Sequence, residues 1–232
     1  MTAAYIIGAY SSAFGRRNED SVKDLTREAY LAVLADAGLA DGGMIESVYF
    51  GNCGMWTDNQ GSIRGQVCLT PMTREGRLPE RIPMTNVEAG CATASLALNG
   101  AWKDILSGQA EVSLAMGVEK TFYPKAPDKA AKLYFGGIDQ YDPQEWQDYY
   151  RAAGDAAGKP FEPGPDRTIF MDTYAMQACY HMKKYGLTQR QIAAGGKAAK
   201  LSQSEQTALL DGYRLCWRMQ AASKLLSDKP LD

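Results

Sequence analysis

The sequence has 232 residues, of which 45% are hydrophobic and 22% charged, with a formal net charge of -2. This composition is typical of a soluble globular protein with one large or two small domains. The weak net charge argues against broad electrostatic binding to nucleic acid or to an anionic membrane. No apolar run approaches the roughly 20 residues of a membrane span, and the start lacks the basic residues of a signal peptide. The five cysteines are scattered, with no CxxC pair. We therefore expect a cytoplasmic protein without a disulfide framework or a metal site.

Strands and helices alternate along the first half of the chain. Apolar runs predict strands over residues 4–8, 45–51, 82–87 and 111–118. Helical spacing predicts a helix capped by Ser21 and ended by Gly38, a short helix over 60–69, and a helix that follows Cys91 and ends at Gly108. The last is apolar almost all round, which is typical of a helix buried between two layers. The charged residues 70–80 predict turns. This alternation predicts an α/β layered fold with parallel strands.

The second half has a different composition. Residues 119–167 are rich in Lys, Asp, Pro, Gly and aromatic residues, which favours a loop subdomain over a continued sheet. A helix is predicted over Ile169–Tyr185, and Thr188 is predicted to cap another. We therefore expect an N-terminal α/β domain over residues 1–118 and a loop subdomain over residues 119–232, with an atypical pattern after about residue 195.

Cys91 is the candidate nucleophile. It lies in the run NVEAGCATASLAL, residues 86–98, where a predicted strand gives way to a helix. Unpaired N–H groups and the helix dipole favour a thiolate there, and the Cys91 N–H can help to hold an oxyanion. Gly90 permits a tight turn, and small residues follow. A buried structural cysteine is the more common case for such spacing, so the spacing alone leaves both interpretations open and does not identify a nucleophile.

Several motifs together resemble the N-terminal half of a thiolase, closest to the sterol-carrier-protein type and to acetyl-CoA acetyltransferases. Asn86-Val87 leads into Cys91-Ala-Thr-Ala-Ser95 as the family's strand leads into its nucleophile helix. Further matches are EVSLAMGVEK at 111–120, QGSIR at 60–64, DAGL at 36–39 and HMKKYG at 181–186. The resemblance covers roughly residues 4–194. It implies a layered αβα half with a mixed sheet and a buried helix.

The resemblance also implies a chemistry. Cys91 takes an acyl group as a thioester and passes it to or from coenzyme A, which divides one difficult acyl transfer into two easier ones. Coenzyme A thioesters are substrates, with no permanently bound cofactor. The loop subdomain covers the site, with Met171 and Tyr174 near the acyl pocket. Lipid or aromatic acid degradation is the expected setting, and a homodimer is expected to pair through residues 82–87.

The match fails in three places. Ala94 replaces a glycine of the nucleophile motif. Residues 195–222 match nothing in the family, which suggests a local reading-frame change, and the match returns at 224–230. The chain is also expected to lack the last strand of the first sheet and the entire second half, which in thiolases brings a catalytic histidine and a second cysteine. An incomplete sheet predicts a poorly stable isolated chain.

The remaining candidate residues are expected to be structural. His181, the one histidine of the sequence, matches a non-catalytic family position. Structural roles are also expected for Gln60, Arg64 and the cysteines Cys53, Cys68, Cys179 and Cys216. Three hypotheses stay open. The first is an acyl-CoA C-acyltransferase completed by a C-terminal half or an accessory subunit. The second is a non-catalytic acyl-CoA-binding or complex subunit. The third is an aldolase or synthase of the same superfamily.

Overall fold

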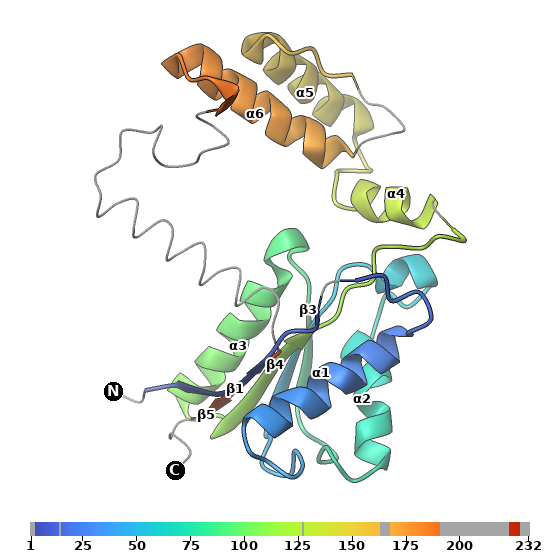
Figure 1. Ribbon diagram of the computed structural model, residues 1–232, viewed down its shortest axis with the longest axis vertical. Helices are drawn as coiled ribbons and strands as arrows, with labels where there is room; N and C mark the ends of the chain where they lie inside the picture. Colours follow the sequence, from blue (N-terminus) through green and yellow to red (C-terminus); the bar gives the residue numbers. More distant parts are fainter. Residues whose placement is uncertain (1–2, 14, 127, 163–167, 191–222, 228–232) are drawn as a thin grey trace. The chain divides into compact units, whose positions relative to one another are not determined.

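The computed structural model describes residues 3–13, 15–126, 128–162, 168–190 and 223–227 (Figure 1). They divide into two compact units. The first contains β1 (Tyr5–Tyr10), α1 (Val22–Asp36), β2 (Ser47–Gly51), the 3-10 turn η1 (Met55–Asp58), α2 (Arg64–Arg74), β3 (Met84–Val87), the 3-10 turn η2 (Gly90–Ala92), α3 (Thr93–Ser107), β4 (Val112–Gly117) and β5 (Ser223–Ser227). The second contains α4 (Asp128–Phe135), α5 (Pro143–Ala157) and α6 (Ile169–Tyr185). The predicted domain boundary between residues 118 and 119 stays a prediction.

The described strands form one mixed five-stranded sheet in the order β1-β5-β4-β2-β3. β2 runs parallel to both β3 and β4, whereas β5 runs antiparallel to β1 and β4. The predicted α/β layered fold with a mixed sheet is confirmed. The expectation that the chain lacks the last strand of this sheet is wrong, because residues 223–227 fill the place between β1 and β4. Poor stability of the isolated chain was predicted from a missing strand, and because the strand is present, that reason no longer applies.

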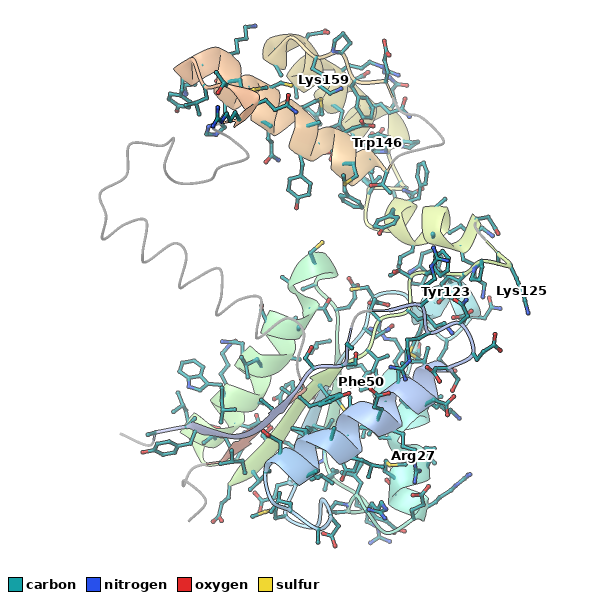
Figure 2. The ribbon with its side chains drawn as sticks, viewed as in Figure 1. Arg27, Phe50, Tyr123, Lys125, Trp146 and Lys159 are labelled. Carbon is teal, nitrogen blue, oxygen red and sulfur yellow. The ribbon has the colours of Figure 1, made fainter. Side chains whose placement is uncertain are left out.

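Helices cover both faces of the sheet. In Figure 1, α1 and α2 lie on one face and α3 on the other. Alternate residues of each strand point to opposite faces, so β4 contributes Leu114 and Met116 to the core under α1 and α2, and Ala115 to the core under α3. Phe50 of β2, labelled in Figure 2, is fully buried in the first of these cores. The fold thus has three layers, with the sheet in the middle.

Two of the predicted helices differ in the structure. The second helix was expected over residues 60–69, but α2 runs from Arg64 to Arg74 with Pro71 inside it. Its buried residues continue at helical spacing from Gly65 to Met72, and this apolar stripe outweighs the charged residues that predicted turns. α3 was expected to be buried all round, yet one side is open: Leu96, Trp102 and Leu106 are 42%, 44% and 38% exposed in this chain.

The second unit is helical where the sequence predicted a loop excursion. α5 begins at an Asp142 cap followed by Pro143, and its Trp146 and Tyr150 pack with Phe161 in an aromatic cluster (Figure 2). The predicted helix over Ile169–Tyr185 is confirmed as α6. The helix predicted to continue beyond residue 190 and the atypical stretch 195–222 lie outside the described residues. None of the helices in the described ranges is both long enough and apolar enough to cross a membrane.

Gly100 sets how closely α3 approaches the sheet, and this predicts a stability effect. A Cβ at Gly100 would lie 2.2 Å from the ring of Tyr49, whose hydroxyl donates a hydrogen bond of 2.8 Å to Asp104. Gly100→Ala should therefore lower the free energy of unfolding by about 1–3 kcal/mol, since ring and helix must move apart. Urea denaturation measures this. Gly61→Ala is the matched control, because its added methyl meets no atom closer than 3.9 Å. Equal losses in the two variants would contradict the prediction.

Candidate functional site

The candidate site lies where three parallel strands end side by side. β4, β2 and β3 are neighbours in the sheet, and their carboxyl ends lie at one edge. β2 is followed by Asn52-Cys53-Gly54, β3 by Glu88-Ala89-Gly90-Cys91, and β4 by Val118-Glu119. In open α/β sheets this edge is the usual place for ligand binding. The loops after these three strands therefore define the site.

The ends of β2 and β4 approach too closely for any side chain. Gly51 and Gly117 are partners across the two strands, and a Cβ on Gly117 would lie 2.8 Å from the Gly51 carbonyl oxygen. A Cβ on Gly51 would lie 2.8 Å from Cγ2 of Thr93, the first residue of α3. The two glycines thus let the beginning of α3 rest directly on the strand ends.

Cys91 is presented by a tight turn immediately before α3. Gly90 has a φ of +54°, in the left-handed region that favours glycine. Cys91 is exposed and lies in the 3-10 turn Gly90–Ala92, one residue before Ala92, the N-cap of the helix that begins at Thr93. Within the described residues, no side chain caps the start of α3 by a hydrogen bond. Its first N–H groups can therefore interact with a thiolate or with an oxyanion.

Thr93 and Cys53 hold this turn through hydrogen bonds. The Thr93 hydroxyl donates to the Gly90 carbonyl oxygen at 2.7 Å and accepts from the Ala89 N–H at 2.9 Å. The Cys53 sulfur lies 3.2 Å from the Gly90 oxygen and 2.9 Å from Thr93 Oγ1. Burial raises the pKa of the Cys53 thiol, so this thiol keeps its proton and acts as a hydrogen-bond donor. Cys53 and Cys91 therefore differ in kind, the first engaged and the second open to solvent.

Glu119, just past the end of β4, holds the loop that carries Cys53. Its Oε2 accepts from the Cys53 N–H at 2.8 Å, and its Oε1 accepts from the Gly54 N–H at 2.9 Å and from Asn52 Nδ2 at 3.2 Å. Arg64 binds the Asn52 carbonyl oxygen from the start of α2. Desolvation raises the pKa of Glu119, and the two backbone N–H groups oppose the rise.

Sequence reasoning missed Cys53 and Glu119. Glu119 was noted as part of the family-like run at 111–120 and as the first residue of a loop subdomain, and Cys53 as a structural thiol, but neither was placed beside the Cys91 turn. The signal that identifies both is positional, since each lies within two residues of the end of a predicted parallel strand. With the strand order known, their meeting at one edge follows. The order itself was not available from the sequence.

The other predicted residues belong to the second unit. Met171 and Tyr174 are 64% and 63% exposed on α6, and their place beside an acyl pocket stays a prediction. A cavity of about 470 Å³ between α5 and α6 is lined by Met176 and His181, among others, and not by Met171 or Tyr174. The His181 ring lies 5.3 Å from the ring of Tyr185. Across the described ranges, no group of three or more His, Cys, Asp or Glu side chains is placed to hold a metal ion.

Three comparisons identify what the chain is similar to. A family model described as thiolase, N-terminal domain, matches residues 4–135. An acetyl-CoA acetyltransferase of Methanothermobacter thermautotrophicus is 30% identical over 198 residues, which is 83% of this chain and 43% of that protein. The benzoylsuccinyl-CoA thiolase subunit BbsB of Thauera aromatica is 31% identical over 115 residues, 50% of this chain and 27% of that one.

Among solved structures, the chain is similar to the Acat5 thiolase of Ascaris suum in complex with coenzyme A. It has a TM-score of 0.48 and 18% identity, and the match covers 82% of this chain and 45% of that one. The chain spans less than half the length of the curated relatives it matches.

The raised pKa of Glu119 predicts a pH-dependent stability. Because folding raises this pKa, the folded chain holds the proton more tightly than the unfolded chain at pH values above the ordinary 4.5. The stabilisation is full below that value and is lost as the pH rises through the raised pKa. The difference in unfolding free energy between wild type and Glu119→Gln should therefore shrink as the pH rises above the ordinary pKa of 4.5. Urea titrations at several pH values measure it.

The control for this titration is Glu111→Gln, an exposed glutamate at the opposite end of β4. It removes the same charge without touching the Cys53 loop. A difference that stays flat with pH for Glu119→Gln, or the same trend for Glu111→Gln, contradicts the prediction.

Proposed function

Because the match to the thiolase N-terminal domain covers more than half of its residues, this chain belongs to the thiolase family, and from this we propose that it is the nucleophile-bearing part of an acyl-CoA C-acyltransferase. Its curated relatives include a protein named acetyl-CoA acetyltransferase. The observation that carries the proposal is the exposed Cys91, set by the left-handed Gly90 in front of the uncapped start of α3. Coenzyme A thioesters are the proposed substrates.

The proposed reaction uses Cys91 as an acyl carrier. In the direction of thiolysis, the Cys91 thiolate attacks the C3 carbonyl carbon of a 3-ketoacyl-CoA. The bond between C2 and C3 breaks, and its electron pair leaves on C2, which takes a proton to give acetyl-CoA. The acyl group stays on Cys91 as a thioester. The thiol of a second coenzyme A then takes this acyl group, and its proton returns to Cys91. Condensation runs through the same steps in reverse.

The start of α3 has a defined part in these steps. Negative charge develops on the carbonyl oxygen when sulfur adds to the carbonyl carbon. Backbone N–H groups at a helix N-terminus stabilise such an oxyanion without reorganising. The small residues around Cys91 leave room for the substrate. The oxyanion stabilisation and the room for the substrate both come from residues of this chain, without any contribution from a partner.

The proton transfers need a base. The unit that carries Cys91 contains no histidine, because the one histidine of the sequence, His181, lies on α6 in the other unit. We therefore propose that a complementary C-terminal half or an accessory subunit supplies the base. A homodimer would pair through β3, which forms one edge of the sheet built by the described strands. Met171 and Tyr174 are proposed to contact the acyl chain. The subdomain over residues 119–232 is proposed to cover the active site. The proposed location of the protein is the cytoplasm.

A second candidate function is a non-catalytic acyl-CoA-binding or complex subunit. Two observations favour it. The one histidine of the sequence lies on α6 and not in the unit that carries Cys91, and one relative is named as a subunit, BbsB, of benzoylsuccinyl-CoA thiolase. That relative also favours a setting in aromatic acid degradation. The two functions differ in one measurable event, the formation of a covalent acyl adduct.

The acyl-carrier role predicts an adduct on one cysteine. The chain is incubated with acetyl-CoA or a 3-ketoacyl-CoA. Intact mass should show one acyl group, and peptide mapping should place it on Cys91. Cys91→Ala should abolish it, while Cys179→Ala, which removes a half-buried thiol on α6, should retain it. Absence of both adduct and thiolysis, even with a thiolase C-terminal half added, would favour the non-catalytic function.

A further inference from the structure

A continuous set of contacts joins the end of β4 to the turn that carries Cys91. The Glu119 carboxylate accepts the N–H groups of Cys53 and Gly54, at 2.8 and 2.9 Å. The Cys53 sulfur then reaches the Gly90 carbonyl oxygen at 3.2 Å, one peptide bond before Cys91. Thr93 closes the set from the other side of the turn. Three loops from three strands are thereby held by one carboxylate and one thiol.

This use of a carboxylate is costly for the fold. Desolvation disfavours the charged form of Glu119, and the direction of its pKa shift records that cost. The two N–H groups it binds belong to Gly54, which is buried, and to Cys53, which is half-buried, so water does not freely replace the carboxylate as their acceptor. The carboxylate therefore satisfies backbone donors of the loop after β2 and at the same time fixes that loop beside the Cys91 turn.

Cys53 suits the role of support and not the role of acyl acceptor. Its sulfur contacts both the Gly90 oxygen and Thr93 Oγ1, and its thiol holds its proton because burial raises its pKa. A thiol is a weak nucleophile while protonated. Cys91, in contrast, is exposed. The two cysteines therefore have different roles: Cys53 supports the turn, and Cys91 is available to the substrate.

We propose that Glu119 and Cys53 are positioning residues, which together fix the Gly90–Ala92 turn so that the Cys91 sulfur stays at the start of α3. This inference rests on the proposed function of Cys91 as the acyl carrier. Glu119 sets the loop after β2, and the Cys53 thiol transmits that position to the turn after β3. Loss of either contact frees the turn and weakens the interaction of the Cys91 thiolate with the helix N-terminus.

The test measures the reactivity of Cys91 directly. Iodoacetamide alkylation of Cys91 is followed by peptide mass in wild type, Glu119→Gln, Cys53→Ala and Cys53→Ser. Glu119→Gln and Cys53→Ala should each slow the alkylation by about threefold to tenfold, since thiol reactivity follows the thiolate fraction. Cys53→Ser, which keeps a donor, should recover part of the rate. Glu111→Gln, at the other end of β4, should leave it unchanged.

A folding check separates this effect from unfolding. Cys68 is 2% exposed in the core, so its alkylation stays slow in any variant that folds. If Glu119→Gln labels rapidly at Cys68, Cys53→Ala decides the question alone. Rates at Cys91 equal to or above wild type in a folded variant overturn the proposal, as does equal slowing in Glu111→Gln.

The acyl-adduct assay keeps the two proposals apart. If alkylation depends on Glu119 and Cys53 but no acyl adduct forms in any variant, the positioning role stands and the acyl-carrier role falls. If wild type and both variants form the adduct at one rate and alkylate at one rate, the acyl-carrier role stands and the positioning role falls.

Discussion

The close approach of β2 and β4 at their carboxyl ends is the constraint on which the site depends. Gly51 and Gly117 allow this approach, and Thr93 at the beginning of α3 rests against the first of them. A larger residue at position 51 would push the helix start away from the strand ends, and one at position 117 would push β4 away from the backbone of β2. The position of Cys91 is therefore fixed by backbone packing first, and by side-chain hydrogen bonds second.

The polar contacts around the turn make sense within that packed frame. Backbone groups at the ends of strands have lost their sheet partners and need others. Glu119, Cys53 and Thr93 provide these partners with side chains instead of water, and the three come from segments far apart in the sequence. A network of this kind ties the loops to one geometry. It also explains why an ionisable side chain is kept where its charged form is disfavoured.

Local signals in the sequence predicted most helices and strands, whereas contacts between segments far apart in the sequence were not predicted. The helix over Ile169–Tyr185 follows from its periodicity and a final glycine, and the Ser21 capping box was visible in four letters. Strand β5 was missed because five residues after an atypical stretch carry no periodic signal, and only pairing with β1 and β4 defines it. The contact of Glu119 with the Cys53 loop was not predicted for the same reason, since strand order brings them together and sequence spacing does not reveal strand order.

The open side of α3 connects the chemistry to assembly. Leu96, Trp102 and Leu106 remain exposed on the helix that begins directly after the Cys91 turn. Apolar side chains at this spacing favour a covered surface. The one histidine of the sequence, His181, belongs to α6 and not to the unit that carries the Cys91 turn, so the proposed acyl transfer calls for a base from elsewhere. A complementary half that covered α3 would reach the same end of the helix as the reacting thiol. Completing the fold and completing the catalytic site would then be one event.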